Sequence, residues 1–396
     1  MLTWIGFFVS ISVLLLISRK HLGLAIGTAG IVLGLFTIPP FHIWRNVLLV
    51  LTDPSIILLT IAMGIIPIIG GILEKSGGLD NIVNNLRIGK KPFLALAPGL
   101  VGMLPMPGGA LLSSPLVEKA GEDSSPNTKS ALNVWFRHIP FLIYPLSPTL
   151  IVSAKIAGLQ VYEVIPYLFP LFLLSIFLGY FFFLRKTKGE LIYKGKFSLK
   201  KLSVPLSVIL LAPLLDFSLQ RIFKFQVSEL ATVLAVLSSL ILALVSSKFR
   251  LANVKEVCKK MKPWNFALIV IGMFIFLNMF KESGVGELIA SLSLSKTLLC
   301  VVIGFGLGFA TGRVEIPASI VIPIFLGTFS LNSMAPESFA ITFFGILLGY
   351  IISPVHPCVS VSIEYFTVRI GSFLREIALP TFIGLLITII LGLFFI

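Results

Sequence analysis

Long apolar runs alternate along the whole chain with short polar connections. Most of these runs come close to the length of about 20 residues that a helix needs to cross the hydrocarbon core of a bilayer. Helices are therefore expected over residues 2–18, 22–38, 55–73, 127–158, 162–184, 202–219, 227–247, 264–281, 337–365 and 377–396. The pattern predicts an all-α polytopic membrane protein of about ten transmembrane helices.

Two apolar stretches, at residues 92–118 and 297–326, break this pattern with prolines and glycines. The first carries PMPGG at its centre and is too short for two full spans, since each needs about 20 residues. Each stretch is therefore expected to form a re-entrant hairpin that enters and leaves the membrane on one face. Two of the expected spans are also interrupted, at PLSPT (residues 145–149) and at SPVHPC (residues 353–358).

Short matches recur in the same order and at nearly constant spacing, which indicates an internal repeat. Ser76-Gly77 recurs as Ser283-Gly284, and Ser147-Pro148 recurs as Ser353-Pro354. Each half holds five expected spans, an odd number, so the second half is inserted upside down. We expect two inverted-topology repeats, residues 1–185 and 202–396, joined by a basic cytoplasmic linker at 186–201.

Composition supports the membrane assignment, because 57% of the residues are hydrophobic, 12% are charged, and the mean hydropathy is +1.04. These values exclude a soluble globular domain. The net charge of +14 comes from lysines and arginines in the connections between apolar runs. Most of them fall on one side of the expected topology, which places that side in the cytoplasm and both termini outside. No nucleic-acid-binding motif accompanies the charge, so a nucleic-acid partner is not expected.

The broken segments are where chemistry is expected. Irregular backbone survives at membrane depth only inside protein or along a watery cavity. The N-terminal ends of half-helices suit an anion, and unwound carbonyls suit a cation. Inverted repeats with paired broken helices are typical of a secondary transporter that binds its cargo near the midplane. The alternative is that the prolines merely kink spanning helices.

Two sets of candidate site residues follow. The substrate-binding set is Gly108, Gly109, Ser113, Ser114, Thr311, Gly312, Arg313 and Ser319. The ion-coupling set is Ser147, Thr149, Glu315, Ser353, Val355 and His356. Arg313 is expected to clamp a carboxylate with two hydrogen bonds, or else to pair with Glu315 or Glu364. His356 either titrates and carries a proton or packs as a neutral, hydrogen-bonded ring.

Other chemistry has little support in the sequence. Arg137 and His138 lie near the expected cytoplasmic end of their helix, where Arg137 is expected to reach the membrane surface. The three cysteines are far apart and show no metal-ligand spacing, so no metal site, catalytic residue or resident cofactor is expected. A remote alternative is an intramembrane hydrolase that pairs Ser353 or Ser360 with His356.

The segments PMPGGALLSSP (residues 105–115) and ALNVWFRHIPFLIYPLSPTL (residues 131–150) carry a family resemblance. The chain resembles, nearly end to end, a prokaryotic family of integral membrane proteins known as domain of unknown function 401. That family looks like a member of the ion transporter superfamily, with gluconate, lactate, citrate and dicarboxylate permeases and some sodium–proton antiporters. The resemblance implies a scaffold domain, a transport domain that moves as an elevator, and a homodimer in the cytoplasmic (inner) membrane.

Carried onto this chain, the resemblance places the scaffold at residues 1–75 and 202–283 and the transport elements at 87–184 and 296–396. PMPGG and TGRVEIP replace the Ser-Asn-Thr-type tips of the dicarboxylate branch, so neither a dicarboxylate substrate nor sodium coupling is carried over. The expected function is secondary active transport of a small organic anion, a monocarboxylate or sugar acid, coupled to H⁺ or Na⁺. The alternative is a sodium–proton antiporter that titrates Glu315.

Overall fold

The computed structural model describes residues 1–396 except 19, 107, 108, 192, 194, 195, 224, 248 and 250–252. Within this part of the chain the secondary structure is entirely helical. Seven of the described helices are long and apolar enough to cross a membrane, judged by length and composition. The chain is therefore a multi-pass helical membrane protein. The sequence predicted about ten spans, and the remaining expected segments hold helices that are shorter or interrupted.

The described residues of the first half form ten α-helices. They are α1 (Leu2–Ser18), α2 (Leu22–Thr37), α3 (Pro40–Thr52), α4 (Pro54–Lys75), α5 (Gly78–Asn85), α6 (Lys90–Gly102), α7 (Gly109–Ala120), α8 (Pro126–His138), α9 (Pro148–Ile156) and α10 (Val161–Phe182). A 3₁₀ segment, η1 (Ile139–Leu142), follows α8, and another, η2 (Leu184–Lys186), follows α10.

The second half contains the same kinds of elements. They are α11 (Leu199–Ile222), α12 (Glu229–Ser246), α13 (Val254–Met261), α14 (Pro263–Glu282), α15 (Val285–Ala290), α16 (Gly304–Thr311), α17 (Glu315–Thr328), α18 (Pro336–Ile352), α19 (Pro357–Tyr365) and α20 (Ile370–Phe395). A π-helical segment, η4 (Leu298–Ile303), leads directly into α16.

Four short helices, α3, α5, α13 and α15, were not expected from the sequence. Each has 13 residues or fewer, which is shorter than the apolar run of about 20 residues that predicts a spanning helix. Local chemistry still explains where they meet the long helices. Asp53 separates α3 from α4, and its carboxylate accepts hydrogen bonds from the backbone N–H groups of Ser55 and Ile56. With Pro54 in the first turn, this is a favourable helix start.

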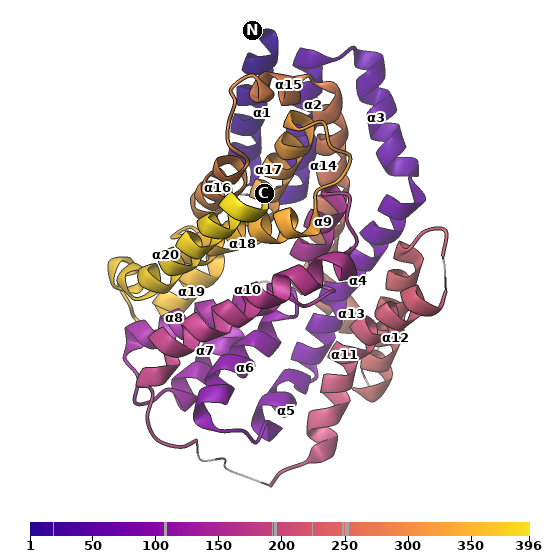
Figure 1. Cartoon of the computed structure of the whole chain (residues 1–396). Coiled ribbons are helices and arrows are strands. Elements are labelled where there is room, and N and C mark those ends of the chain that lie inside the picture. The colour runs from indigo at the N-terminus through magenta and orange to yellow at the C-terminus, as the bar shows by residue number, and fades with distance from the viewer. Residues whose placement is uncertain are drawn as a thin grey trace.

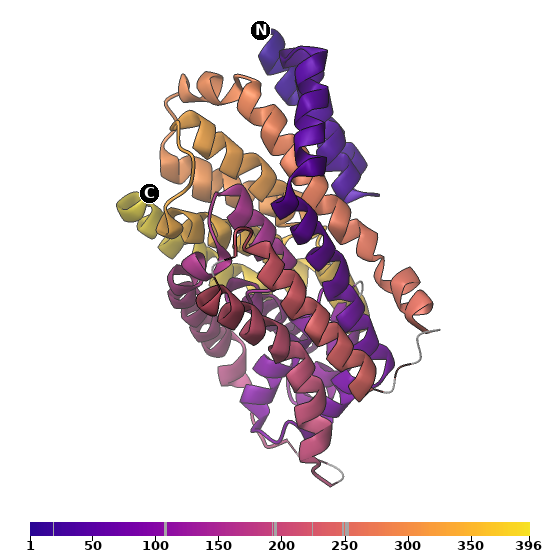
Figure 2. The same cartoon turned by 90° about the vertical axis from the view of Figure 1, so that its right-hand side faces the viewer.

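The helices of the two halves interleave. Helix α2 packs against α14, and α12 packs against α4, while α1 packs on α2 and α11 on α12. Figure 1 shows α5 and α6 at one end of the molecule and α15 and α17 at the other. The view in Figure 2 keeps the indigo N-terminal helices at the upper end and the purple α5–α7 region at the lower end. The two broken stretches thus approach the middle from opposite ends.

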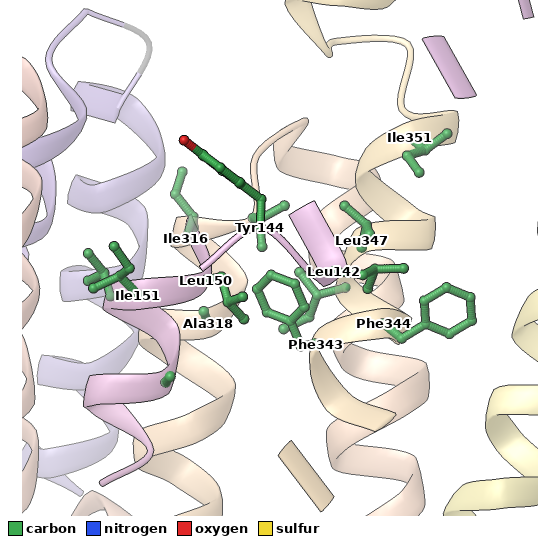
Figure 3. Close-up of a cluster of buried hydrophobic side chains, with 14 of the residues drawn as sticks. Leu142, Tyr144, Leu150, Ile151, Ile316, Ala318, Phe343, Phe344, Leu347 and Ile351 are labelled. Atoms are coloured by element: carbon green, nitrogen blue, oxygen red, sulfur yellow. The ribbon is translucent and has the colours of Figure 1, made fainter. Parts of the chain in front are cut away.

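An apolar core lies where the interrupted helices meet the second broken stretch. Figure 3 shows Leu142, Leu150, Ala318 and Phe343 gathered between the ribbons of η1, α9, α17 and α18. All four side chains are buried. Burying such side chains stabilises a well-packed arrangement through dispersion contacts. This packing holds the ends of the broken segments in place around the site described next.

Candidate functional site

A cavity of about 250 Å³ lies where the four broken segments meet. Its lining comes from both hairpin tips and both helix interruptions. The lining residues are Gly102, Met103, Leu104, Pro105, Met106, Arg137, His138, Phe141, Ser147, Pro148, Thr149, Phe266, Gly312, Arg313, Val314, Glu315, Tyr350, His356, Pro357 and Cys358. Sequence segments more than 200 residues apart therefore share one cavity, whose lining contains both charged and apolar side chains.

Helix ends converge on this cavity. Helices α9, α17 and α19 all begin among its lining residues, and α7 begins at Gly109, just beyond the lining residue Met106. An α-helix N-terminus carries partial positive charge and free N–H groups. The C-terminal ends of α6 and α16 also reach the cavity, so backbone N–H and carbonyl groups are both present. The charged side chains decide which ion is favoured.

Arg137, the penultimate residue of α8, is 4% exposed. Its Nη1 atom is buried and has no hydrogen-bond partner among the described residues, while the side chain contacts the Cys358 thiol. None of the ion pairs among the described residues includes Arg137. The sequence-based expectation that Arg137 reaches the membrane surface is therefore wrong, because the hairpin α6–α7 packs over α8 and encloses the side chain.

Two glycines make that enclosure possible. A Cβ on Gly102 would lie 1.9 Å from the backbone oxygen of Arg137, and a Cβ on Gly109 would lie 1.9 Å from its Nη2. Neither position has room for a side chain. The hairpin backbone thus contacts both the main chain and the guanidinium of Arg137, which fixes the cation against the cavity wall.

Arg313 and Glu315 lie on the second hairpin tip, and both are half-buried on the cavity wall. The ion pairs of the described residues do not join Arg313 to Glu315 or Glu364. Directly before Arg313, Gly312 adopts a left-handed backbone with φ of +59° at the end of α16. That conformation favours glycine and turns the chain into α17.

Two histidines also meet at the cavity wall. The ring centroids of His138 and His356 are 4.6 Å apart, and the Tyr350 ring lies tilted against His356 with its centroid at 3.9 Å. His138 Nδ1 lies 2.7 Å from the Val134 carbonyl oxygen. His356 is fully buried, and neither of its ring nitrogens has a hydrogen-bond partner of good geometry in the part of the chain that the structure describes. The ring of His356 is therefore packed against two aromatic neighbours.

Six of the predicted site residues line the cavity. They are Ser147, Thr149, Gly312, Arg313, Glu315 and His356. Ser147 is buried, and its hydroxyl oxygen has no hydrogen-bond partner among the described residues. It therefore has hydrogen-bonding capacity left for a ligand.

The other predicted site residues lie away from the lining. Ser113, Ser114, Thr311 and Ser319 donate their hydroxyl hydrogens to carbonyls of their own helices. Gly109 contacts Arg137 without lining the cavity. Gly108 lies outside the described residues.

Two predicted ion-coupling residues at the SPVHPC break also point elsewhere. Ser353 donates to the Phe309 carbonyl at 2.6 Å, and the side chain of Val355 is 57% exposed. Among the described residues no hydrogen bond joins His356 to Ser353 or Ser360, so the serine–histidine pair that a hydrolase would need is not formed.

Asn133 ties three of the elements around the cavity together. Its amide nitrogen lies 2.9 Å from Ser114 Oγ on α7 and 2.8 Å from Ser362 Oγ on α19. It also lies 3.3 Å from the Ala110 carbonyl oxygen. One side chain of α8 therefore fixes the hairpin against the second interrupted helix, near the lining residues Arg137 and Cys358.

A second polar cluster joins α9 and α10 to α11 and α12. Lys155 pairs with the buried Glu229 at 2.5 Å. Tyr162 donates to the buried Asp216 at 2.8 Å, and Thr232 donates to the same carboxylate at 3.0 Å. Asp216 and Glu229 were not singled out from the sequence, where Asp216 is a single acid inside an apolar run.

The sequence reasoning also missed the cavity roles of four residues: Arg137, His138, Tyr350 and Cys358. The segment WFRH did carry a signal, because two ionisable residues follow directly after an apolar stretch. That signal was interpreted as a helix end at the membrane surface. Only the fold shows that the hairpin covers this end and turns it inward.

Comparisons with known proteins agree with this architecture. The family model described as "Protein of unknown function (DUF401)" matches residues 3–395. The chain is also similar to a solved transporter, YdaH from Alcanivorax borkumensis, reported with an unusual topology. That similarity has a TM-score of 0.63 at 16% identity and covers 94% of this chain and 96% of the other. No curated protein matches. At this identity the likeness concerns the fold alone.

Proposed function

Because the chain belongs to the DUF401 family, whose description assigns no activity, we propose its function from the site: secondary active transport of a small organic anion. The observation that carries the proposal is Arg137, a buried arginine on the cavity wall that forms no ion pair with any described residue. An arginine inside a membrane protein is costly and is normally retained for a partner or a ligand.

The charges of the cavity favour an anion. Its lining contains two arginines, Arg137 and Arg313, and one acid, Glu315. None of the three takes part in an ion pair among the described residues. Each guanidinium has a planar array of donors that matches a carboxylate. A volume of about 250 Å³ suits a small molecule such as a monocarboxylate or a sugar acid rather than a large one.

The arrangement of broken helices supports transport in preference to simple binding. Secondary transporters place discontinuous helices at the interface of internal repeats, with the substrate near the midplane. Both hairpin tips and both helix interruptions contribute to this one cavity. The fold likeness to a protein named as a transporter points the same way.

For the whole chain the proposal is an elevator-type member of the ion transporter superfamily. Residues 1–185 and 202–396 would form two inverted repeats joined by the linker at 186–201. The scaffold would be residues 1–75 and 202–283, and the transport elements residues 87–184 and 296–396. The protein would lie as a homodimer in the prokaryotic cytoplasmic membrane with both termini outside.

The coupling ion is proposed to be H⁺ or Na⁺, near Ser147, Thr149 and Glu315. A second candidate function is sodium–proton antiport, favoured by one observation: Glu315 is a half-buried acid on the cavity wall without an ion pair. Cation exchange with no organic substrate would support this candidate.

Thermal unfolding of the purified protein against a panel of organic anions tests the proposal, with and without sodium and at two pH values. A ligand at about 100 times its dissociation constant adds about 2.7 kcal/mol to the free energy of unfolding, which is readily measured. We expect one class of carboxylate to stabilise the protein, and Arg137→Gln and Arg313→Gln to remove that effect.

The matched control is Arg375→Gln, which neutralises an exposed arginine of α20 far from the cavity lining. It should leave the stabilisation by the carboxylate unchanged. If sodium or pH alone shifted the melting temperature and no anion did, the result would contradict anion transport and favour the sodium–proton antiporter.

A further inference from the structure

His138, His356 and Cys358 bring three metal-ligating side chains together on the cavity wall. One ligand atom from each lies within 4.8 Å of the other two. His138 ends α8, whereas His356 and Cys358 flank the start of α19. We propose that these three residues bind a soft transition-metal ion such as Zn²⁺. This inference does not rest on the proposed function, since it concerns the ligand set alone.

The hydrogen bond of His138 presents one nitrogen to the metal. Its Nδ1 lies 2.7 Å from the Val134 carbonyl, and a carbonyl can only accept, so Nδ1 carries the proton. The lone pair is then on Nε2. A metal-bound histidine usually donates its other ring N–H in this way, which fixes the tautomer and the orientation of the ring. Val134 therefore acts as the outer partner of the site.

His356 supplies the second, independent observation. Its side chain is fully buried, and both ring nitrogens lack a hydrogen-bond partner among the described residues. Burying a polar group without a partner costs free energy, so native structures rarely leave one unsatisfied. The ring lies on the cavity wall between His138 and Tyr350, at centroid distances of 4.6 and 3.9 Å. A bond to a metal would satisfy one of these nitrogens.

Cys358 determines which class of metal fits. Two imidazole nitrogens and one sulfur suit Zn²⁺ and related soft ions, whereas Mg²⁺ and Ca²⁺ prefer oxygen. Zinc bonds of about 2.0–2.3 Å require the three ligand atoms to close by roughly an ångström, which side-chain rotation can supply. As the sulfur–metal bond forms, the thiol loses its proton to water.

Arg137 is the charge that opposes such a site, because its guanidinium lies beside the Cys358 thiol. When the metal binds, the thiolate of Cys358 carries a negative charge that compensates the positive charge of Arg137. Three protein ligands also leave the fourth position of a tetrahedral ion open, as in catalytic zinc sites. All three ligands and Arg137 line the same cavity, so an anion bound in it would lie near both the metal and Arg137.

Cobalt binding by the full-length purified protein, with a non-coordinating reductant, tests the proposal. Co²⁺ bound to a thiolate gives a sulfur-to-cobalt charge-transfer absorption. The control is Cys258→Ser with Cys300→Ala, which removes the two cysteines outside the cluster. We expect one Co²⁺ per chain in the wild type and in this control, displaced by Zn²⁺. Cys358→Ser should abolish the absorption, and His356→Gln should weaken binding at least tenfold.

A second measurement leaves all three proposed ligands unchanged. In the Cys258→Ser, Cys300→Ala protein, Zn²⁺ should slow alkylation of Cys358 at least tenfold, and a chelator should restore the rate. Three results would each overturn the site. The control could lack the charge-transfer absorption, Cys358→Ser could retain it, or the rate of Cys358 alkylation could be the same with and without Zn²⁺. Stabilisation by carboxylates is measured separately, so failure of the metal site leaves the proposed function standing.

Discussion

Arg137 is a single residue whose position depends on the fold more than on its own sequence. A cation at the centre of a membrane helix costs about 2.5–3.5 kcal/mol even on scales that allow the side chain to reach for water. Here the side chain is 4% exposed and has no ion pair, and two glycines of the hairpin leave room for it. A ligand carboxylate would supply the missing partner.

Arg137→Lys separates charge from geometry. Lysine keeps the positive charge but loses the planar set of donors that grips both carboxylate oxygens. Carboxylate affinity should therefore fall roughly tenfold, corresponding to about 1.4 kcal/mol, and remain measurable. Calorimetric titration with the stabilising carboxylate checks this. Equal affinity in the lysine variant and the wild type would show that the guanidinium does not contact the carboxylate.

Asp123, in the connection between α7 and α8, is a charged residue outside the helices. Burial alone would raise its pKa, but hydrogen bonds from Lys90 and from the backbone N–H of Lys188 outweigh it and lower the pKa from 3.8. A lowered folded-state pKa contributes stability above the ordinary value, which is lost as pH falls through the folded value. The carboxylate is partly exposed, so the contribution is below about 1 kcal/mol.

Asp123→Asn should therefore lower the melting temperature at neutral pH and flatten its decline between about pH 5 and pH 3. Glu122→Gln, which changes an exposed neighbouring acid, serves as the control and should leave the profile unchanged. Melting temperatures measured across this pH range decide the point. A wild-type profile in the asparagine variant would mean that the Lys90 and Lys188 contacts carry no stability.

At the scale of elements, the hairpin α6–α7 depends on close approach to α8. A Cβ at Gly102 would lie 1.9 Å from the Arg137 backbone oxygen. Relieving this clash would require the backbone to shift, which costs more free energy than rotating a side chain. Gly102→Ala should therefore destabilise the protein by about 1–3 kcal/mol, as overpacking does. Thermal unfolding without ligand measures the change.

Gly306→Ala is the matched control for this prediction. It lies on an exposed face of α16 and a Cβ there would meet nothing within 4 Å. Alanine should be neutral or stabilising by up to about 1 kcal/mol in a helix interior. Similar melting temperatures for the two alanine variants would contradict the packing of the hairpin against α8.

How far the sequence predicts these elements depends on the strength of the local signal. Hydrophobic run length predicts the long helices, and Pro/Gly clusters predict the two broken stretches and the two interruptions. Helices α3 and α13 are missed because they are too short for a run-length signal. The cavity is predicted in part: Arg313 and Glu315 stand out locally. The inward position of Arg137 and the meeting of His138 with Cys358 depend on packing between distant segments.

At the scale of the whole molecule, a polar cluster links the proposed transport elements to the proposed scaffold. Lys155 on α9 pairs with Glu229 on α12, and Tyr162 on α10 bonds to Asp216 on α11. If α9 and α10 move against α11 and α12 during transport, these contacts must break and re-form. The pair Lys260–Glu74, at 2.7 Å, instead joins α13 to α4 within the proposed scaffold.

Cross-linking tests that motion. The double variant Lys155→Cys, Glu229→Cys is made in the background lacking Cys258 and Cys300. Cross-linking its two new cysteines with a short bifunctional thiol reagent should abolish uptake. Glu74→Cys with Lys260→Cys, bridged in the same way, should retain most of it. Uptake that survives the first cross-link would exclude movement of α9 relative to α12 and, with it, the elevator proposal.

Uptake of the stabilising carboxylate into proteoliposomes tests the central claim most directly. A pH or sodium gradient is imposed, and wild type is compared with Arg137→Gln and Arg375→Gln. We expect the wild type and Arg375→Gln to accumulate the carboxylate above its equilibrium concentration, and this accumulation to disappear when the gradient is dissipated. Arg137→Gln should not accumulate the carboxylate. Absence of gradient-driven uptake in the wild type, or normal uptake by Arg137→Gln, would contradict anion transport through this cavity.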